Sequence, residues 1–309
     1  MEVHNYKIGN NAVRISSPFP LFQFLDGLFE NNSDLAKDHI SINVLKGRQY
    51  NKILNGNNLD IYFQKFEPRD SFSIIPLIQC VLRMVSYTNI IQNKQPVLCH
   101  GSVCFYKNNG ILFGDDDGNS TGKTFLSLEL AMKSGTYCVD EYPLLKTNLE
   151  VEGFDIPIHI RKDMKNHYLD VHKIHLIGDF AHKDDIFIKP SSLFNFKKYG
   201  KIRYIIYPHF VSNSEGKFTE LGPEDSINSF SYCVAAHIAK FIYPELDRFK
   251  SGSSTETIKI DDRIKKICND IISKYNIDSY SRRICSQAKS FLVEYRNDNT
   301  VNVILDELF

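Results

Sequence analysis

The chain has 309 residues, of which 24% are charged and 42% hydrophobic, a composition typical of a globular protein. It excludes a disordered tail, a collagen and a highly charged scaffold, and the length allows about two domains. The 37 basic side chains balance 37 acidic ones, so the net charge that attracts proteins to nucleic acid or to anionic lipid is missing. We therefore expect neither a nucleic-acid nor a membrane partner.

The seven cysteines and the start of the chain indicate the compartment. The cysteines form no C-x-x-C pair, and several stand in apolar runs, which favours reduced core thiols over disulfides or structural zinc. The opening MEVHNYKIGNNAV lacks the basic and apolar regions of an export signal, and no uninterrupted apolar run approaches the length of a membrane span. We expect a soluble, cytoplasmic protein.

The segment 1–93 is predicted to be an N-terminal α/β subdomain without recognisable chemistry. Its apolar patterns predict three strands and two helices. The strands are expected at 12–15, 40–45 and 59–63, and the helices at 21–28 and 75–86.

The segment 94–250 is predicted to be the catalytic core. Pro96 opens the strand-like run VLCHGSVCFY, and the turn signal Asn108-Asn109-Gly110 separates it from the apolar run 111–113. The loop GDDDGNSTGKT follows, and then an amphipathic helix from Phe125 that Gly135 ends. A short β-prone run, 136–139, comes next. Two adjacent strands, a loop, a crossover helix and a further strand are expected.

Gly122-Lys123-Thr124 between a strand and a helix is typical of a phosphate-binding loop. Backbone N–H groups and the helix N-terminus hold phosphate oxygens, the lysine reaches the β- and γ-phosphates, and the threonine hydroxyl binds Mg²⁺. The predicted nucleotide-binding residues are Gly118, Asn119, Ser120, Thr121, Gly122, Lys123 and Thr124. The loop departs from G-x-x-x-x-G-K-[ST], because Gly118 lies one residue too near Gly122, so the loop either starts at Gly118 and is shorter or starts at Gly114 and is longer. The alternative is an acidic surface turn, since three aspartates, 115–117, precede it.

Asp140 and Glu141 follow the predicted strand 136–139, sixteen residues beyond Thr124. In a parallel sheet this spacing places both carboxylates beside the loop, at the edge where α/β proteins place their chemistry. One carboxylate could hold Mg²⁺ and the other could accept the proton of an attacking hydroxyl. The alternative is a helix cap or a solvated strand end.

Two further groups of residues, His100 and a basic stretch with three histidines, have possible functional roles. His100 lies in an apolar strand, where a hydrogen-bonded core histidine is the more common case. His167, His172 and His175 lie close together in HYLDVHKIH, but no cysteine or HExxH pattern accompanies them, which disfavours a metal site. The surrounding stretch 161–203 holds ten Lys/Arg against five Asp/Glu and is the one basic region.

The remaining pattern predicts strands at 156–161 and at 204–208, the second ended by Pro208. Helical spacing of apolar residues is found at 227–241, 264–272 and 284–292. Residues 251–255 read as a flexible linker, and 251–309 as a C-terminal helical segment.

The ordered set VLCHGSVCFYKNNGILFGDDDGNSTGKTFLSLELAMKSGTYCVDEYPLL resembles the C-terminal domain of the HPr serine kinase/phosphorylase family, and especially its small, divergent members such as lasso-peptide-associated peptide kinases. Agreement at PIHIR and YIIYPHF extends the resemblance to about half the chain. It implies an α/β fold similar to the P-loop fold of phosphoenolpyruvate carboxykinases, with a mixed sheet flanked by helices.

The resemblance also implies roles for individual residues. Asp140 would activate the acceptor hydroxyl with His100 as its partner, and Arg161 would neutralise the transferred phosphoryl group. Thr124 and Glu141 would be the metal residues, although Glu141 stands where the family has a second aspartate. The implied activity is ATP- and Mg²⁺-dependent phosphorylation of a hydroxyl, favouring Ser or Thr of a peptide or protein. A small-molecule kinase, a non-catalytic nucleotide-binding regulator and a homo-oligomer stay open.

Overall fold

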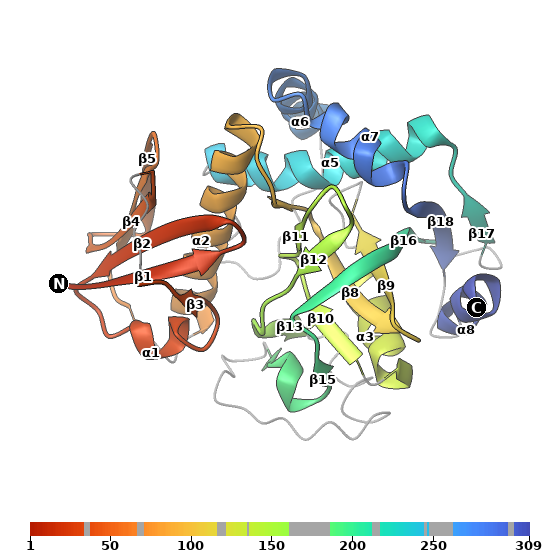
Figure 1. Ribbon diagram of the computed structural model, residues 1–309, viewed down its shortest axis with the longest axis horizontal. Coiled ribbons are helices and arrows are strands. Elements are labelled where there is room, and N and C mark those ends of the chain that lie inside the picture. The colour runs from red at the N-terminus through yellow and green to blue at the C-terminus, as the bar shows by residue number, and fades with distance from the viewer. Residues whose placement is uncertain are drawn as a thin grey trace. The chain divides into compact units, whose positions relative to one another are not determined.

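The computed structural model describes residues 1–33, 38–66, 71–115, 122–134, 136–160, 186–211, 217–243, 246, 262–295 and 300–309 (Figure 1). The chain divides into two units. The first comprises Met1–Thr88 and Asp155–Leu193, and the second comprises Asn89–Phe154 and Phe194–Phe309. The prediction made 251–309 a segment of its own. In the structure these residues belong to the same unit as the phosphate loop, because the strand Lys289–Tyr295 joins its sheet.

The first unit is built on a six-stranded mixed sheet in the order β3-β1-β2-β4-β6-β5. β2, β4 and β6 are parallel, while β1 and β3 on one side and β5 on the other add antiparallel pairs. The three predicted strands are confirmed as β2, β4 and β6. The bounds are β1 Glu2–Ile8, β2 Asn11–Ser17, β3 Glu30–Asn31, β4 Ile40–Lys46, β5 Asn51–Asn55 and β6 Asn58–Phe63.

Two helices accompany this sheet, as predicted, but with different lengths. α1 is a single turn, Phe22–Leu25, whereas α2 extends over Ser71–Ile91. Within the described residues, Ile74–Ile91 of α2 is long and apolar enough to cross a membrane, yet 89% of this stretch is buried. Burial of this kind is typical of a core helix. The unit also contains the antiparallel pair β13 (Ile158–Ile160) and β14 (Ile186–Ile188) and a 3₁₀ turn at Pro190–Ser192.

The second unit contains a ten-stranded mixed sheet with the main order β15-β10-β8-β9-β16-β12-β11-β7, to which β18 and β17 add beside β16. Its core includes fully buried aromatic residues such as Phe113, Tyr137 and Tyr207. The bounds are β7 Val97–Leu98, β8 Gly101–Tyr106, β9 Asn109–Gly114, β10 Thr136–Val139, β11 Leu144–Leu145, β12 Glu150–Glu152, β15 Asn195–Phe196, β16 Tyr199–Phe210, β17 Lys217–Glu220 and β18 Lys289–Tyr295.

The predicted hairpin and crossover are confirmed. β8 and β9 are joined by a tight turn at Lys107 and Asn108, both with positive φ, which matches the twist of the strands it joins. α3 (Lys123–Ser134) then connects β9 to β10 and packs against both and against β8. Because β8 pairs antiparallel with β9 and with β10, the latter two run parallel with β8 between them. Gly135 lies outside the described residues.

Two of the predicted elements differ from the structure. Pro208 does not end its strand, which continues to Phe210. The pairing of β16 with β9 ends at Ile206, so the missing N–H of Pro208 breaks no hydrogen bond to β9. The predicted helix 284–292 is wrong. α7 ends at Cys285, and Phe291 and Leu292 belong to β18, which pairs along β16 with alternating burial near its end. An aromatic and β-branched run that finds strand partners overrides a helical spacing.

The helices predicted at 227–241 and 264–272 are confirmed. α5 (Pro223–Ile242), α6 (Asp262–Lys274) and α7 (Ile277–Cys285) contact one another, and Figure 1 shows them grouped together. A last helix, α8 (Thr300–Leu308), contacts α3 and β17. The protein is thus of the mixed α/β class, with two mixed sheets flanked by helices. All seven cysteines are free, and all but Cys285 are buried, as the reduced-thiol prediction requires.

Candidate functional site

The first residues of α3 supply the lysine and hydroxyl of the predicted phosphate loop. Lys123 and Thr124 form the first turn of the helix, preceded by Gly122 with φ of +88°. This left-handed conformation suits glycine, and a Cβ at the position would overlap the Tyr295 hydroxyl. Lys123 is only 8% exposed, so its charge is largely shielded from bulk water. Gly122 and Tyr295 of β18 together fix the backbone conformation at this helix start.

Asp140 lies directly after β10 and accepts hydrogen bonds from two hydroxyls. The Thr124 hydroxyl donates to it, with its oxygen 3.0 Å from Oδ1 and 3.2 Å from Oδ2. Ser102, on the neighbouring strand β8, also donates to Oδ1. The predicted juxtaposition of strand end and helix start is therefore confirmed. Ser102 is an addition that the sequence reading did not single out.

Burial raises the pKa of Asp140 to about 6, with the nearby Glu141 carboxylate as the second cause. Lys123 and the hydroxyls of Ser102 and Thr124 act in the opposite direction by stabilising the charged form. A buried carboxylate with a pKa raised toward neutrality can both accept and release a proton at physiological pH. Such perturbed groups cluster at functional sites.

A second buried carboxylate, Asp115, links the histidine and the lysine. Its Oδ2 lies 3.4 Å from Nδ1 of His100 and 3.5 Å from Nζ of Lys123, and the side chain is 1% exposed. The backbone assists, because Asp115 N–H donates to the His100 carbonyl at 3.1 Å. By sequence, Asp115 is one of the three aspartates that favour an acidic surface turn. In the structure it occupies the position between two basic groups.

Glu141 has a strained backbone held by its neighbours. Its φ of +63° is uncommon for a non-glycine residue. Its carbonyl oxygen lies 2.8 Å from Nε2 of His237, and because a carbonyl only accepts, that nitrogen carries the proton. The side chain lies 3.8 Å from Lys123 Nζ and accepts from the Tyr142 hydroxyl at 3.0 Å. Glu141 is therefore directed to the same lysine as Asp115.

His237 could have been found in the sequence. It lies three residues after Val234 on the apolar face of α5, at a position where a histidine is unusual. Its ring packs at a steep angle against His100, with centroids 5.1 Å apart. The backbone N–H of His100 donates to the backbone carbonyl of Cys233, also on α5, at 2.9 Å. α5 thus positions the histidine that the sequence singled out.

The described part of the site holds three carboxylates, Asp115, Asp140 and Glu141, around Lys123. Of the predicted site residues, His100, Gly122, Lys123, Thr124, Asp140 and Glu141 lie within the described part of the chain. Gly118, Asn119, Ser120, Thr121 and Arg161 lie outside it, as do His167, His172 and His175. Within the described ranges, no group of three or more His, Cys, Asp or Glu side chains is arranged to hold a metal ion.

In comparisons with known proteins, no family profile and no curated protein matches this chain.

Proposed function

We propose that the protein is an ATP- and Mg²⁺-dependent kinase that transfers the γ-phosphoryl group to a hydroxyl. The observation on which this rests is that Thr124, beside the buried Lys123 at the start of α3, hydrogen-bonds Asp140 at the end of β10. A helix start with a lysine and a hydroxyl is suited to phosphate, and a carboxylate of raised pKa beside it is suited to an acceptor hydroxyl. The resemblance to the HPr kinase family supports the same conclusion.

The residues present fit a Mg²⁺–nucleotide. Mg²⁺ prefers hard oxygen ligands and is commonly held by one or two carboxylates together with substrate phosphates, so a complete protein cage is not needed. The Thr124 hydroxyl and the Glu141 carboxylate supply such oxygens. Lys123 would meet the β- and γ-phosphates. When bound, the cation would neutralise charge on the phosphates as the transfer proceeds.

In the proposed reaction, Asp140 accepts the proton of the acceptor hydroxyl. The hydroxyl oxygen forms a bond to the γ-phosphorus, the bond between that phosphorus and the β,γ-bridging oxygen breaks, and ADP leaves with the bridging oxygen. Thr124 donates to both oxygens of Asp140 and Ser102 donates to Oδ1, which makes three contacts; an ionised carboxylate has about four acceptor sites, so one remains for the substrate. Lys123 stabilises charge on the phosphates.

The favoured acceptor is a Ser or Thr hydroxyl of a peptide or protein in the cytoplasm, following the family resemblance. Seven free cysteines support a cytoplasmic setting. A free hydroxyl compound would use the same machinery.

A mass-spectrometric assay with ATP and Mg²⁺ tests the proposal. Wild type is offered a library of Ser/Thr peptides and small alcohols beside the variants Lys123→Ala, Asp140→Asn and, as a matched control, Lys266→Ala on the exposed face of α6. We expect one added phosphate with wild type and the control. Lys123→Ala should lose ATP binding and transfer, whereas Asp140→Asn should lose transfer and keep ATP binding.

Two results would contradict the kinase. ATP binding by wild type without transfer to any acceptor, and without ADP formation, would indicate a nucleotide-binding regulator. If the Lys123→Ala variant binds ATP as wild type does, the loop at α3 is not a nucleotide site.

A further inference from the structure

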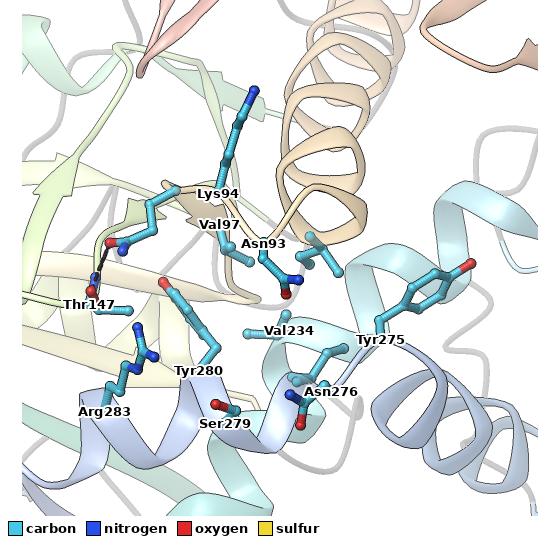
Figure 2. Close-up of a pocket in the computed structure, with 13 residues that line it drawn as sticks. Asn93, Lys94, Val97, Thr147, Val234, Tyr275, Asn276, Ser279, Tyr280 and Arg283 are labelled. Carbon is cyan, nitrogen blue, oxygen red and sulfur yellow. Dashed lines mark hydrogen bonds between the residues drawn. The ribbon is translucent and has the colours of Figure 1, made fainter.

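A cavity of about 300 Å³ lies in the second unit among residues that the kinase proposal does not use (Figure 2). It is bounded by the end of α2 and the loop after it, by Thr147 beyond β11, by α5, and by the turn between α6 and α7 with the start of α7. The volume is at the lower end of the range for small-molecule sites, about 300–1,000 Å³. None of the lining residues belongs to the cluster around Asp140.

The floor of this cavity is apolar and its wall is aromatic. Ile90, Val97, Val234 and Ile277 line it and are buried, with Val234 fully so. Tyr280 stands beside them and donates from its hydroxyl to the Leu145 carbonyl, which fixes the ring. Of these side chains, Tyr280 is the one that is part-exposed, and its ring offers a flat surface to a ligand.

A second wall of the cavity is held in place by the side-chain amide of Gln95, which is hydrogen-bonded to Thr147. The Gln95 side-chain oxygen accepts from the Thr147 N–H at 2.7 Å and from the Thr147 hydroxyl at 2.9 Å, as the dashed lines in Figure 2 show. Gln287 donates in turn to the Thr147 carbonyl at 2.7 Å. These hydrogen bonds fix the position of Thr147 in the cavity wall.

The two cationic side chains of the lining, in contrast, are not engaged with other described residues. The lining includes Lys94 and Arg283 but no Asp or Glu. Within the described part of the chain, neither side chain forms an ion pair or a hydrogen bond. By contrast, the adjacent Arg282 pairs with Glu224 at 2.9 Å and does not line the cavity. Figure 2 shows Arg283 extending from α7 beside Tyr280 toward Thr147, while Lys94 extends to the outside.

Three further lining side chains offer uncommitted hydrogen-bonding groups. The amides of Asn93 and Asn276 and the hydroxyl of Ser279 form no hydrogen bond with any other described residue. In Figure 2, Asn93 and Asn276 stand on the side of Tyr280 away from Arg283 and Thr147, and Ser279 lies between Arg283 and Asn276. The cavity therefore combines a fixed apolar floor, a positive edge and free polar groups.

We propose that this cavity binds a small organic anion. Its carboxylate or phosphate group meets the Arg283 guanidinium, whose planar donors suit either group, and its apolar body lies against the Tyr280 ring. Lys94 adds a second positive charge at the rim. The proposal is independent of the kinase activity, because it uses none of the same residues.

Backbone NMR titration of the intact protein with three probes tests this site. Benzoate and phenyl phosphate carry the two anionic groups on one apolar ring, and benzamide is the neutral counterpart of benzoate. We expect both anions to shift the amides of Thr147, Ser279 and their neighbours at millimolar concentration, with little effect from benzamide. Arg283→Gln should weaken anion binding by about tenfold or more, as loss of a charged hydrogen bond implies.

Arg282→Gln is the matched control, since it removes the same charge one residue away and should bind as wild type does. Lys94→Gln, an exposed substitution that leaves folding intact, should weaken binding to a smaller extent. The proposal is overturned if no probe shifts these amides in wild type, or if benzamide binds as well as benzoate. It is also overturned if Arg282→Gln and Arg283→Gln weaken the anions equally, because general charge attraction would then explain the effect.

Discussion

The burial of Asp140 lowers the stability of the folded protein and also suits this carboxylate to act as a base. Its carboxylate is buried next to Glu141, which disfavours the charged form, and it is supported by two hydroxyls and one lysine, which favour it. The balance leaves its pKa at about 6. A base for hydroxyl activation is most effective when its pKa lies near the working pH, so the burial that costs stability serves the proposed transfer.

The first prediction at this scale concerns pH. Transfer needs the ionised carboxylate, so kcat/KM should be constant at neutral pH and should fall as the pH drops through about 6, the pKa of Asp140. The measurement is a pH profile of ADP formation at saturating Mg²⁺. A profile without an acidic limb near this value would exclude Asp140 as the base.

The second prediction concerns stability. Because the pKa in the folded protein, about 6, is above the ordinary value of 3.8, folding favours the protonated carboxyl, and stability decreases as pH rises between these values. Asp140→Asn removes this penalty. We expect the variant to melt at a higher temperature than wild type above about pH 7 and to show no gain below about pH 4. Equal gains at both pH values would point to a cause other than ionisation.

The third prediction concerns Asp115, which contacts both His100 and Lys123. A carboxylate in contact with the phosphate-binding lysine competes with an anionic ligand. Asp115→Asn keeps the shape and the backbone bond to His100, so ATP should bind about three- to tenfold more tightly, as removal of one nearby like charge implies. Calorimetric titration measures this. Weaker ATP binding would instead assign Asp115 the task of orienting Lys123.

At the scale of elements, the helix start at Gly122 depends on a strand from the far end of the sequence. Tyr295 of β18 fills the space beside Gly122, whose φ is +88°. Burial raises the pKa of the Tyr295 phenol to about 12, so it stays neutral beside the loop. The contact connects the C-terminal strand to the phosphate loop.

Gly122→Ala is therefore expected to disrupt the site. The new Cβ would overlap the Tyr295 ring and occupy a disfavoured backbone conformation, with a cost of about 1–3 kcal/mol to folding. The measurement is the free energy of unfolding in urea together with ATP affinity. The control is Gly56→Ala, because Gly56 also has positive φ but no atom lies within 4 Å of its Cβ position. Equal losses would show that backbone strain alone is responsible.

Also at this scale, the sequence indicated most elements of the site but not their full set. The hairpin, the crossover helix and the strand ending at Asp140 follow from turn residues and apolar spacing near one another in the chain. β18 was read as helix, since its apolar spacing fits a helix until its pairing with β16 is known. His237 stands out as a histidine on the apolar face of α5, but no local pattern indicates that it meets Glu141 or that Ser102 of β8 meets Asp140.

At the scale of the whole molecule, the cysteines test the prediction of a reduced interior. Burial raises the pKa of Cys99 and of Cys285 to about 12, and that of Cys104 well above its usual value. Thiolates are the reactive form, so native protein should resist alkylation at the six buried cysteines, with slow reaction at most at Cys285. Mass spectrometry after iodoacetamide treatment, with and without urea, measures this. Rapid labelling of a buried cysteine in the native protein would contradict the described core.

The sequence by itself determined the α/β class, the helix after Gly122-Lys123-Thr124, and the crossover from this helix to the strand that Asp140 follows. Short-range patterns suffice for these, because turns, caps and apolar periods act between neighbouring residues. Only the tertiary structure decided that Asp115 lies between His100 and Lys123, that α5 holds Glu141, and that Arg283 borders a separate cavity. Those contacts join residues far apart in the chain, and their energy depends on burial that no local pattern encodes.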